Sequence, residues 1–308
     1  MGSSLEILRG RTGGQIVAIL SKVCGGDEEK LDALLRDELE VKLIERVSKL
    51  ADKNGRVIPA KGLKNAVCDP DKKFYLVQPS LNTIDGYANR LVYFQEAFKP
   101  GLFMSVAEFE GRANELIGQI KDNKKIVNLL NGVYLPIILP KLESIEDYGR
   151  ALERIFLPAV KFSFEKQFPG RKFYSYRENE LEGKVGIVEG TRHEKLVFNM
   201  IKSYVVAIYF PNPLQGFSVL ASREQLFHLP ESLLMAGGFD TAIALAMYPD
   251  VLARDWYTPG LDLSALSWQS SDYSLCFVAD DGGLYFGSRG NLGGASGSYS
   301  SGLLFVGS

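Results

Sequence analysis

The residues best suited to acid–base chemistry in this chain gather around one of its two histidines. His193 lies in the tetrad Thr191-Arg192-His193-Glu194, and the second histidine is His228. A histidine beside a carboxylate could transfer a proton near neutral pH. The tetrad lacks the HExxH spacing of zinc proteases, and a lone histidine near a helix start is more often structural or solvated. We keep an enzyme of unknown class, with a site near Arg192, His193 and Glu194, as an alternative function.

The other candidate motifs predict neither a catalytic nor a metal site. The segment Gly10–Gly14 (GRTGG) lacks the Gly-Lys-Ser/Thr ending of a phosphate-binding loop and follows no predicted strand. Asp280 and Asp281 are adjacent, so a turn fits them better than an acid/base pair, whose members must face each other. The three cysteines are far apart and predict reduced thiols. We expect no metal and no cofactor.

Composition places the chain among ordinary globular proteins. Of 308 residues, 46% are apolar and 23% are charged, and a chain of this length usually forms two domains. The net charge of −2 argues against a general nucleic-acid binder. The sequence has neither a signal-peptide pattern nor the run of about 20 apolar residues that crosses a bilayer. These features predict a cytoplasmic protein without a membrane span, and they leave display on a cell surface open.

Charge and periodicity divide the sequence into two regions. Residues 1–202 contain 32 basic and 28 acidic residues, whereas residues 203–308 contain three and nine. Such a shift indicates regions with different roles. We place the domain boundary near residue 125 and predict an α+β protein, with residues 1–125 mainly helical. The helical predictions cover 27–52, 84–98, 105–131, 144–168, 193–204 and a stretch from 229 to 247, and the strand predictions cover 74–77, 131–140, 172–176, 205–210 and short strands from 266 onward.

The last 39 residues, 270–308, have an unusual composition. They contain no Lys, Glu, Gln, Met or Trp, and Tyr, Ser, Gly, Asn and Asp lie between apolar residues. A disordered linker would not need apolar residues at strand-like spacing, so we expect Leu275, Phe277, Leu284, Phe286 and 303–306 to be buried. A structured glycine-rich region without a special role is a second interpretation. The third is a recognition surface, because the same residue types dominate antibody loops.

The genetic code favours the third interpretation. Lys, Glu, Gln, Met and Trp are all encoded only by codons that end in a purine. Randomising the first two bases of an adenine-rich codon such as AAC yields Asn, Asp, Ser, Gly, Tyr and their relatives, and never a stop codon. In this respect the segment resembles the variable proteins of diversity-generating retroelements, which diversify the C-terminal part of a C-type-lectin-like domain, related to formylglycine-generating enzymes, through mutagenic reverse transcription.

Three short motifs carry the rest of the resemblance, which covers about residues 126–308. Gly302–Val306 looks like the closing strand of that family without its arginine, and Leu266–Trp268 matches loosely the segment that precedes the variable part. Leu229-Pro230-Glu231 is similar to a helix entry of the related sulfatase-modifying fold. The calcium-binding motifs of sugar-binding lectins and the paired cysteines of formylglycine-generating enzymes are missing, so those two activities are not implied.

The resemblance implies a non-enzymatic ligand-binding protein. A helical N-terminal region, 1–125, would precede a C-type-lectin-like domain, 126–308, with short twisted strands and glycine-rich loops. Its diversified surface at about 270–301 would bind an unknown protein or other macromolecular ligand, in an unknown oligomeric state. The expected ligand-facing residues are Asp272, Tyr273, Asp280, Asp281, Ser288, Arg289, Asn291, Ser296, Ser298 and Tyr299. An assembly protein that pairs through its C-terminal strand is a further alternative.

Overall fold

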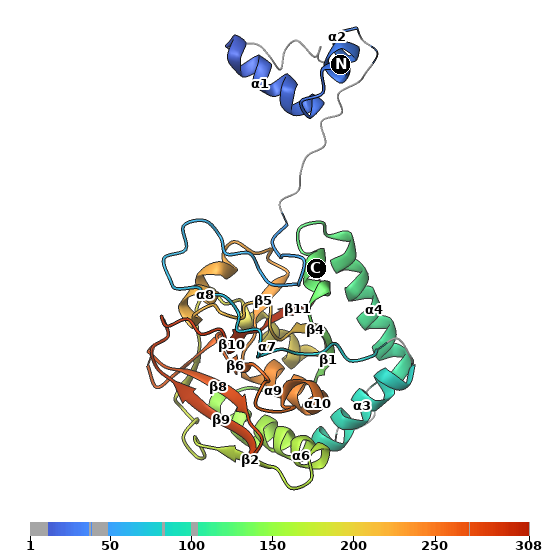
Figure 1. Ribbon diagram of the computed structural model, residues 1–308. Helices are drawn as coiled ribbons and strands as arrows, with labels where there is room; N and C mark the ends of the chain where they lie inside the picture. Colours follow the sequence, from blue (N-terminus) through green and yellow to red (C-terminus); the bar gives the residue numbers. More distant parts are fainter. Residues whose placement is uncertain are drawn as a thin grey trace. The chain divides into compact units, whose positions relative to one another are not determined.

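The computed structural model describes residues 12–36, 38, 49–81, 84–99, 104–270 and 272–307. Helices and strands are both plentiful, so the α+β prediction is confirmed. The chain forms two compact units, residues 1–47 and 48–308 (Figure 1). The boundary expected near residue 125 falls inside the second unit, because the helices on either side of residue 100 pack into the same core as the sheets.

The first unit contains two short helices, α1 (Gly13–Cys24) and α2 (Glu28–Leu35). Thr12 caps α1 through the amide of Gln15, and Gly25, with φ of 67°, ends it in the left-handed region. Asp27 caps α2, as predicted. The predicted helix 27–52 is confirmed only over 28–35. Residues 37 and 39–48 lie outside the described residues, and 49–52 are not helical because Ala51 bridges Val57.

A four-stranded sheet lies at the centre of the second unit. Its order is β1-β4-β11-β5, formed by β1 (Leu135–Leu139), β4 (Val205–Phe210), β11 (Leu303–Phe305) and β5 (Leu233–Met235). The C-terminal strand β11 is antiparallel to β4 on one side and to β5 on the other. Both edges of the C-terminal strand are therefore occupied within the chain.

The second sheet has five strands in the order β10-β6-β8-β9-β2. They are β10 (Tyr299–Ser301), β6 (Gly260–Asp262), β8 (Ser274–Ala279), β9 (Gly283–Arg289) and β2 (Lys172–Ser175). Strands β8 and β9 form an antiparallel hairpin, whereas β2 joins β9 in parallel. A small sheet pairs β3 (Val185–Ile187) with β7 (Leu266–Trp268). Residues 270–301, which we call the recognition segment, therefore contribute one hairpin and the edge strand β10.

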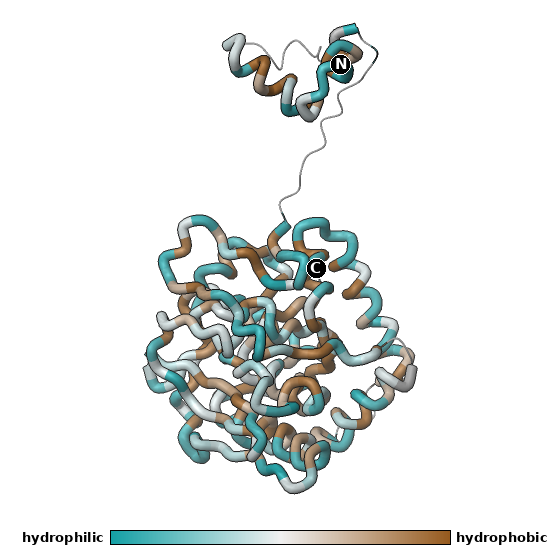
Figure 2. The backbone as a smooth tube through the Cα atoms, in the orientation of Figure 1, coloured by the Kyte–Doolittle hydropathy of each residue, from teal (hydrophilic) through white to brown (hydrophobic). Residues whose placement is uncertain are grey.

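Helices surround the sheets. The helices are α3 (Ile84–Phe98), α4 (Val106–Asp122), α5 (Tyr148–Ala151), α6 (Leu157–Gln167), α7 (His193–Lys202), α8 (Val219–Leu226), α9 (Gly238–Met247) and α10 (Pro249–Leu252), with a 3-10 turn η2 (Val127–Asn131) and a π turn η3 (Leu152–Phe156). Along α4, hydrophilic and hydrophobic positions alternate, because one face of the helix is buried (Figure 2). Every residue of α9 is buried, so this helix forms the centre of the core.

Three helical predictions change in detail. The predicted helix 144–168 consists of α5, η3 and α6, because Pro158 has no amide to donate and a π turn precedes it. The predicted helix 105–131 ends at Asp122 and resumes only as η2. The predicted helical stretch 229–247 splits into β5 and α9.

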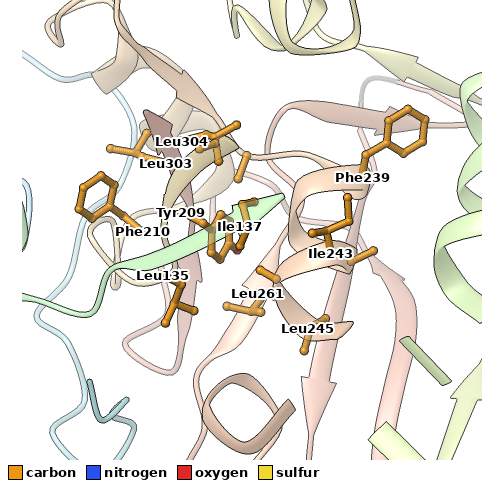
Figure 3. Packing of buried hydrophobic residues seen from close by; sticks show 14 of the residues in the cluster. Leu135, Ile137, Tyr209, Phe210, Phe239, Ile243, Leu245, Leu261, Leu303 and Leu304 are labelled. Carbon is orange, nitrogen blue, oxygen red and sulfur yellow. The ribbon is translucent and has the colours of Figure 1, made fainter. Parts of the chain in front are cut away.

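The apolar residues of the tail are buried as predicted. Leu275, Phe277, Leu284 and Phe286 are at most 1% exposed, and Leu303 and Leu304 are fully buried. Figure 3 shows Leu303 and Leu304 beside Tyr209 and Phe210 of β4 in the same apolar cluster as Phe239 of α9. The tail is therefore part of the fold, and the disordered-linker interpretation is wrong for residues 272–307.

Candidate functional site

The histidine expected as a catalytic candidate is enclosed by the core. His193 is fully buried at the first residue of α7. Its Nε2 lies 2.8 Å from the Tyr148 hydroxyl, and its Nδ1 lies 3.3 Å from the carbonyl oxygen of Met235. A carbonyl only accepts, so Nδ1 carries the proton and Nε2 accepts from the tyrosine. Burial lowers the pKa of His193 to about 4, and the imidazole is neutral at pH 7.

The Tyr148 hydroxyl completes this network at the start of helix α9. It accepts hydrogen bonds from the amides of Gly238 and Phe239, at 3.0 and 3.2 Å. In the first turn of the same helix, one carboxylate oxygen of Asp240 accepts from the Gly237 amide at 2.9 Å, and the other has no hydrogen-bond partner. Burial raises the pKa of Asp240 to about 7. The network ties α7 to α9 and faces no solvent.

Arg192 also has a structural role. It is 8% exposed, and its φ of 61° is rare for a residue with a side chain. Its guanidinium donates to the carbonyl oxygens of Leu226, Leu229, Pro230 and Leu233. These bonds hold the end of α8 and the approach to β5. Glu194 is exposed, so it points away from the buried imidazole, and the four residues of the tetrad do not converge on one site.

Strand register decides which side chains of the recognition segment face solvent. Val278 of β8 lies opposite Tyr285 of β9, and Tyr285 lies opposite Tyr174 of β2. Residues opposite each other point to the same side of a sheet. The alternate residues of the hairpin, such as Phe277 and Phe286, form the buried side. The other side also carries Ser274 and Cys276, which are buried. We call its exposed or partly exposed part, formed by Tyr174, Tyr176, Val278, Tyr285 and Gly287, the open face.

Three tyrosines stack on the open face. The ring of Tyr285 lies between those of Tyr174 and Tyr176, with centroid distances of 5.4 and 5.8 Å and interplanar angles of 13° and 10°. Tyr174 is 46% exposed and Tyr176 is 63% exposed. Stacking orders the rings in advance, so a partner can contact them with little further loss of entropy. We call these three residues the tyrosine ladder.

The predicted ligand-facing residues divide between the two ends of the hairpin. The register runs from Ser274 opposite Arg289 to Ala279 opposite Leu284, a length of about 17 Å at roughly 3.4 Å per residue. The exposed residues Asp272 and Tyr273 lie at one end, while Asp280 and Asp281 lie at the turn. The turn is held by Asp280, whose carboxylate accepts from the amides of Gly282 and Gly283 at 2.7 and 2.8 Å.

The fold brings Arg289 and Tyr299 together, but Arg289 is paired with the buried Asp262 of the scaffold. Nη1 of Arg289 lies 3.0 Å from Oδ2 of Asp262, which is buried, and its guanidinium carbon lies 4.6 Å from the centroid of the Tyr299 ring. Its Nη2 donates to the carbonyl of Gly294 at 3.2 Å. Arg289 therefore links β9 to β6, β10 and the loop that follows β9. Ser288 also has a partner, since its hydroxyl accepts from Nε of Arg177 at 3.2 Å.

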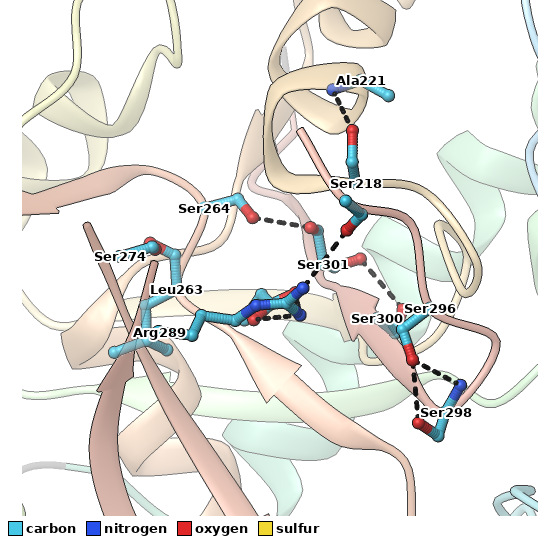
Figure 4. A network of polar contacts seen from close by, with 12 residues as sticks. Ser218, Ala221, Leu263, Ser264, Ser274, Arg289, Ser296, Ser298, Ser300 and Ser301 are labelled. Carbon is cyan, nitrogen blue, oxygen red and sulfur yellow. Dashed lines mark hydrogen bonds and ion pairs between the residues drawn. The ribbon is translucent and has the colours of Figure 1, made fainter. Parts of the chain in front are cut away.

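The loop 290–298 holds the remaining predicted residues. Asn291 is exposed in the left-handed region, at φ of 54°. The hydroxyls of Ser296 and Ser298 are 2.9 Å apart (Figure 4). The carbonyl of Gly297, between them, accepts from the amide of Asp71 at 3.0 Å and from Nε2 of Gln215 at 2.8 Å. Scaffold residues from distant parts of the sequence therefore fix this loop.

Sequence reasoning missed several exposed aromatic side chains. Tyr174 lies in β2 and Tyr176 directly follows it, about 100 residues before the hairpin that β2 joins. Trp256 and Tyr257 are 55% and 50% exposed, and the Trp256 amide donates to Asp281 at 3.5 Å, beside the hairpin turn. A Trp-Tyr pair in a polar context was the available signal for the latter two. No local pattern marks Tyr174 and Tyr176 as surface residues beside the hairpin.

Comparisons with known proteins give no relative. No family model, no curated protein and no solved structure matches the chain.

Among the described residues, no group of three or more histidine, cysteine or carboxylate side chains is placed to hold a metal ion. Within the same residues, none of the helices is both long and apolar enough to cross a membrane.

Proposed function

We propose that the protein is a non-enzymatic binding protein that presents residues 270–301 as a diversified recognition surface. Residues 126–308, which lie within the second unit, would act as a C-type-lectin-like scaffold, and the chain would be a variable protein of a diversity-generating retroelement. The ligand would be a protein or another macromolecule. A cytoplasmic location is part of the same proposal.

One observation supports this proposal: most apolar residues of the recognition segment are buried, whereas most of its polar residues are exposed or partly exposed. Most of its apolar residues enter the core, together with Ser274, Ser300 and Ser301. Its exposed or partly exposed positions are Tyr, Ser, Gly, Asn and Asp together with Val278, Arg289 and Ala295. A surface that changes its specificity needs this division, because substitutions must alter contacts with the ligand and leave the packing of the scaffold intact. The tyrosine ladder adds large aromatic side chains, which often dominate binding energy.

Both alternatives fit the geometry less well. A partner strand could pair with β11 only by displacing β4 or β5, since each already bonds one of its edges. This weakens the proposal of assembly through the C-terminal strand. An acid–base role for His193 would need substrate to reach a fully buried imidazole that is engaged by Tyr148 and Met235. This weakens the proposed enzyme site.

The experiment that tests the proposal is sequencing of the gene's 3′ end and its flanks across a population of the source organism. We expect a nearby near-copy of the codons for 270–301 that differs mainly at adenines, beside a gene for a reverse transcriptase. Constant codons without such a copy would refute diversification, and the composition of the segment would then reflect a glycine-rich β region.

A further inference from the structure

The glycines of the recognition segment are not explained by backbone conformation. Seven lie between residues 282 and 297, and none has a positive φ. Elsewhere in the chain, nine described glycines do, Gly216 with φ of 86° among them. A side chain is therefore compatible with the backbone at all seven positions, and only packing can require glycine there.

Packing requires glycine at two of the seven positions. A Cβ atom on Gly283 would lie 2.4 Å from the carbonyl oxygen of Lys172, on the neighbouring strand β2. A Cβ atom on Gly297 would lie 2.6 Å from the amide nitrogen of Asp71. Both obstacles are backbone atoms, which cannot move aside as a side chain does.

Three other glycines have room for a side chain. The nearest atom to an added Cβ belongs to the Tyr176 ring at 3.7 Å for Gly287, and to the Tyr273 ring at 3.4 Å for Gly290. For Gly293 the nearest atom is a methyl carbon of Leu220, at 3.9 Å. These are ordinary van der Waals distances. All three glycines are partly exposed, so neither conformation nor packing explains them.

The three positions also border the aromatic side chains of the surface. Gly287 lies on the open face, two residues after Tyr285 of the tyrosine ladder and against the ring of Tyr176. Gly290 lies against Tyr273. A side chain at either position would change the contacts that a ligand makes with a neighbouring ring, because aromatic anchors and the residues around them act together.

We propose that Gly287, Gly290 and Gly293 are specificity-determining positions, at which the surface accepts larger side chains and thereby changes what it binds. This inference rests on the proposed function. It predicts that natural variation in 270–301 includes these three positions and omits Gly283 and Gly297. The fold tolerates change at the first group and forbids it at the second.

The first test measures the Tm of full-length single variants. Gly287→Ala, Gly290→Ala and Gly293→Ala are expected to keep the Tm or raise it by about 1–3 °C, because alanine restricts the unfolded chain. The matched controls Gly283→Ala and Gly297→Ala are expected to lower it by more than about 5 °C, or to prevent folding. Equal losses in both groups would overturn the inference. An invariant gene would refute diversification without changing these Tm values, so the two failures are distinguishable.

The second test measures binding with a purified lysozyme as the probe. The full chain is displayed with positions 287, 290 and 293 randomised to Gly, Ser, Asn, Asp and Tyr. A control library of the same size randomises Gly111, Asn114 and Glu115 on helix α4, which lies away from the five-stranded sheet (Figure 1). We expect lysozyme binders at least 10-fold more often from the first library. Equal recovery from the two libraries, or none from either, would overturn the assignment.

Discussion

Two polar regions of the second unit differ in what their side chains contact. Around His193, the Tyr148 hydroxyl bonds to the imidazole and to backbone amides, and the imidazole and the Arg192 guanidinium donate to backbone carbonyls inside the core. On the open face of the five-stranded sheet, Tyr174 and Tyr176 are exposed and Tyr285 is partly exposed, and Asp272, Tyr273 and Asp281 are exposed at the hairpin ends. Reactive residue types therefore do not locate a functional site by themselves. Burial assigns the first region to the stability of the fold and leaves the second available to a ligand.

Arg289 belongs to the recognition segment by sequence, but it is paired with a buried carboxylate. Its replacement therefore has the largest expected effect. We expect Arg289→Ala to lower the free energy of unfolding by about 3–5 kcal/mol, because it leaves the buried carboxylate of Asp262 unpaired. Chemical denaturation measures this, with Arg112→Ala, in an exposed pair with Glu108, as a control that changes little. An Arg289→Ala variant as stable as the control would mean that Arg289 is a ligand-facing residue, as its sequence position first indicated.

His193 tests the closed region. Replacing it by alanine removes a buried ring, the acceptor for the Tyr148 hydroxyl proton and the imidazole donor to the Met235 carbonyl. We expect His193→Ala to cost about 2–4 kcal/mol. The matched control is His228→Ala, at an exposed position, which should cost almost nothing. Similar stability of the two variants in thermal and urea unfolding would show that the network around His193 does not support the fold.

The pH dependence of stability separates His193 from Asp240. The pKa of His193 falls from 6.5 to about 4 on folding, so its contribution is lost as pH falls from 6.5 towards 4. The pKa of Asp240 rises from 3.8 to about 7, so its contribution is present at low pH and lost as pH rises through 7. Each amounts to about 3 kcal/mol, and the two nearly cancel in the natural chain.

Single variants expose the two opposing contributions. With Asp240→Asn, we expect the change in stability between pH 7 and pH 4 to be about 3 kcal/mol less favourable than in the natural chain, because the opposing aspartate contribution is removed while those of other buried groups, such as Asp262, are unchanged. With His193→Gln, the change should instead be more favourable than in the natural chain over the same interval. Urea unfolding at several pH values measures both slopes. Parallel curves for the two variants would contradict the buried, neutral state of His193.

The smallest effects are expected at the exposed ends of the hairpin. Asp272→Ala and Asp281→Ala remove side chains that are exposed to solvent, so each should change the free energy of unfolding by less than about 0.5 kcal/mol. Leu275→Ala, at a buried position between them in the sequence, provides the contrast, with an expected loss of about 2–5 kcal/mol. Losses of several kcal/mol at the two aspartates would mean that they support the scaffold.

Local pattern predicted much of this fold. Helix 84–98 and strand 205–210 lie where their periodicity and apolar content placed them, and the anchors Leu275, Phe277 and Leu284 are buried. Each of these depends on residues close in sequence. The alternation of apolar and polar residues in the tail was therefore sufficient to identify its buried side.

Long-range pairing limited what could be predicted of the surface. The parallel pairing of β2 with β9 brings Tyr174 and Tyr176 beside Tyr285, and the pairing of β6 with β8 places Asp262 beneath Arg289. Neither pairing leaves a local signal. For the same reason Arg289 was predicted to face a ligand. The boundary expected near 125 marked the end of the predicted helical region, whereas the compact units follow packing.

The central claim, that an interchangeable surface rests on a fixed scaffold, is tested most directly by a scan of all single substitutions from 272 to 301, sorted for folded full-length protein. We predict that most side chains are accepted at exposed or open positions such as Asp272, Asp281 and Gly287, and that few are accepted at Leu275, Phe286 and Gly297. Equal tolerance at both groups, or rejection at both, would contradict the claim.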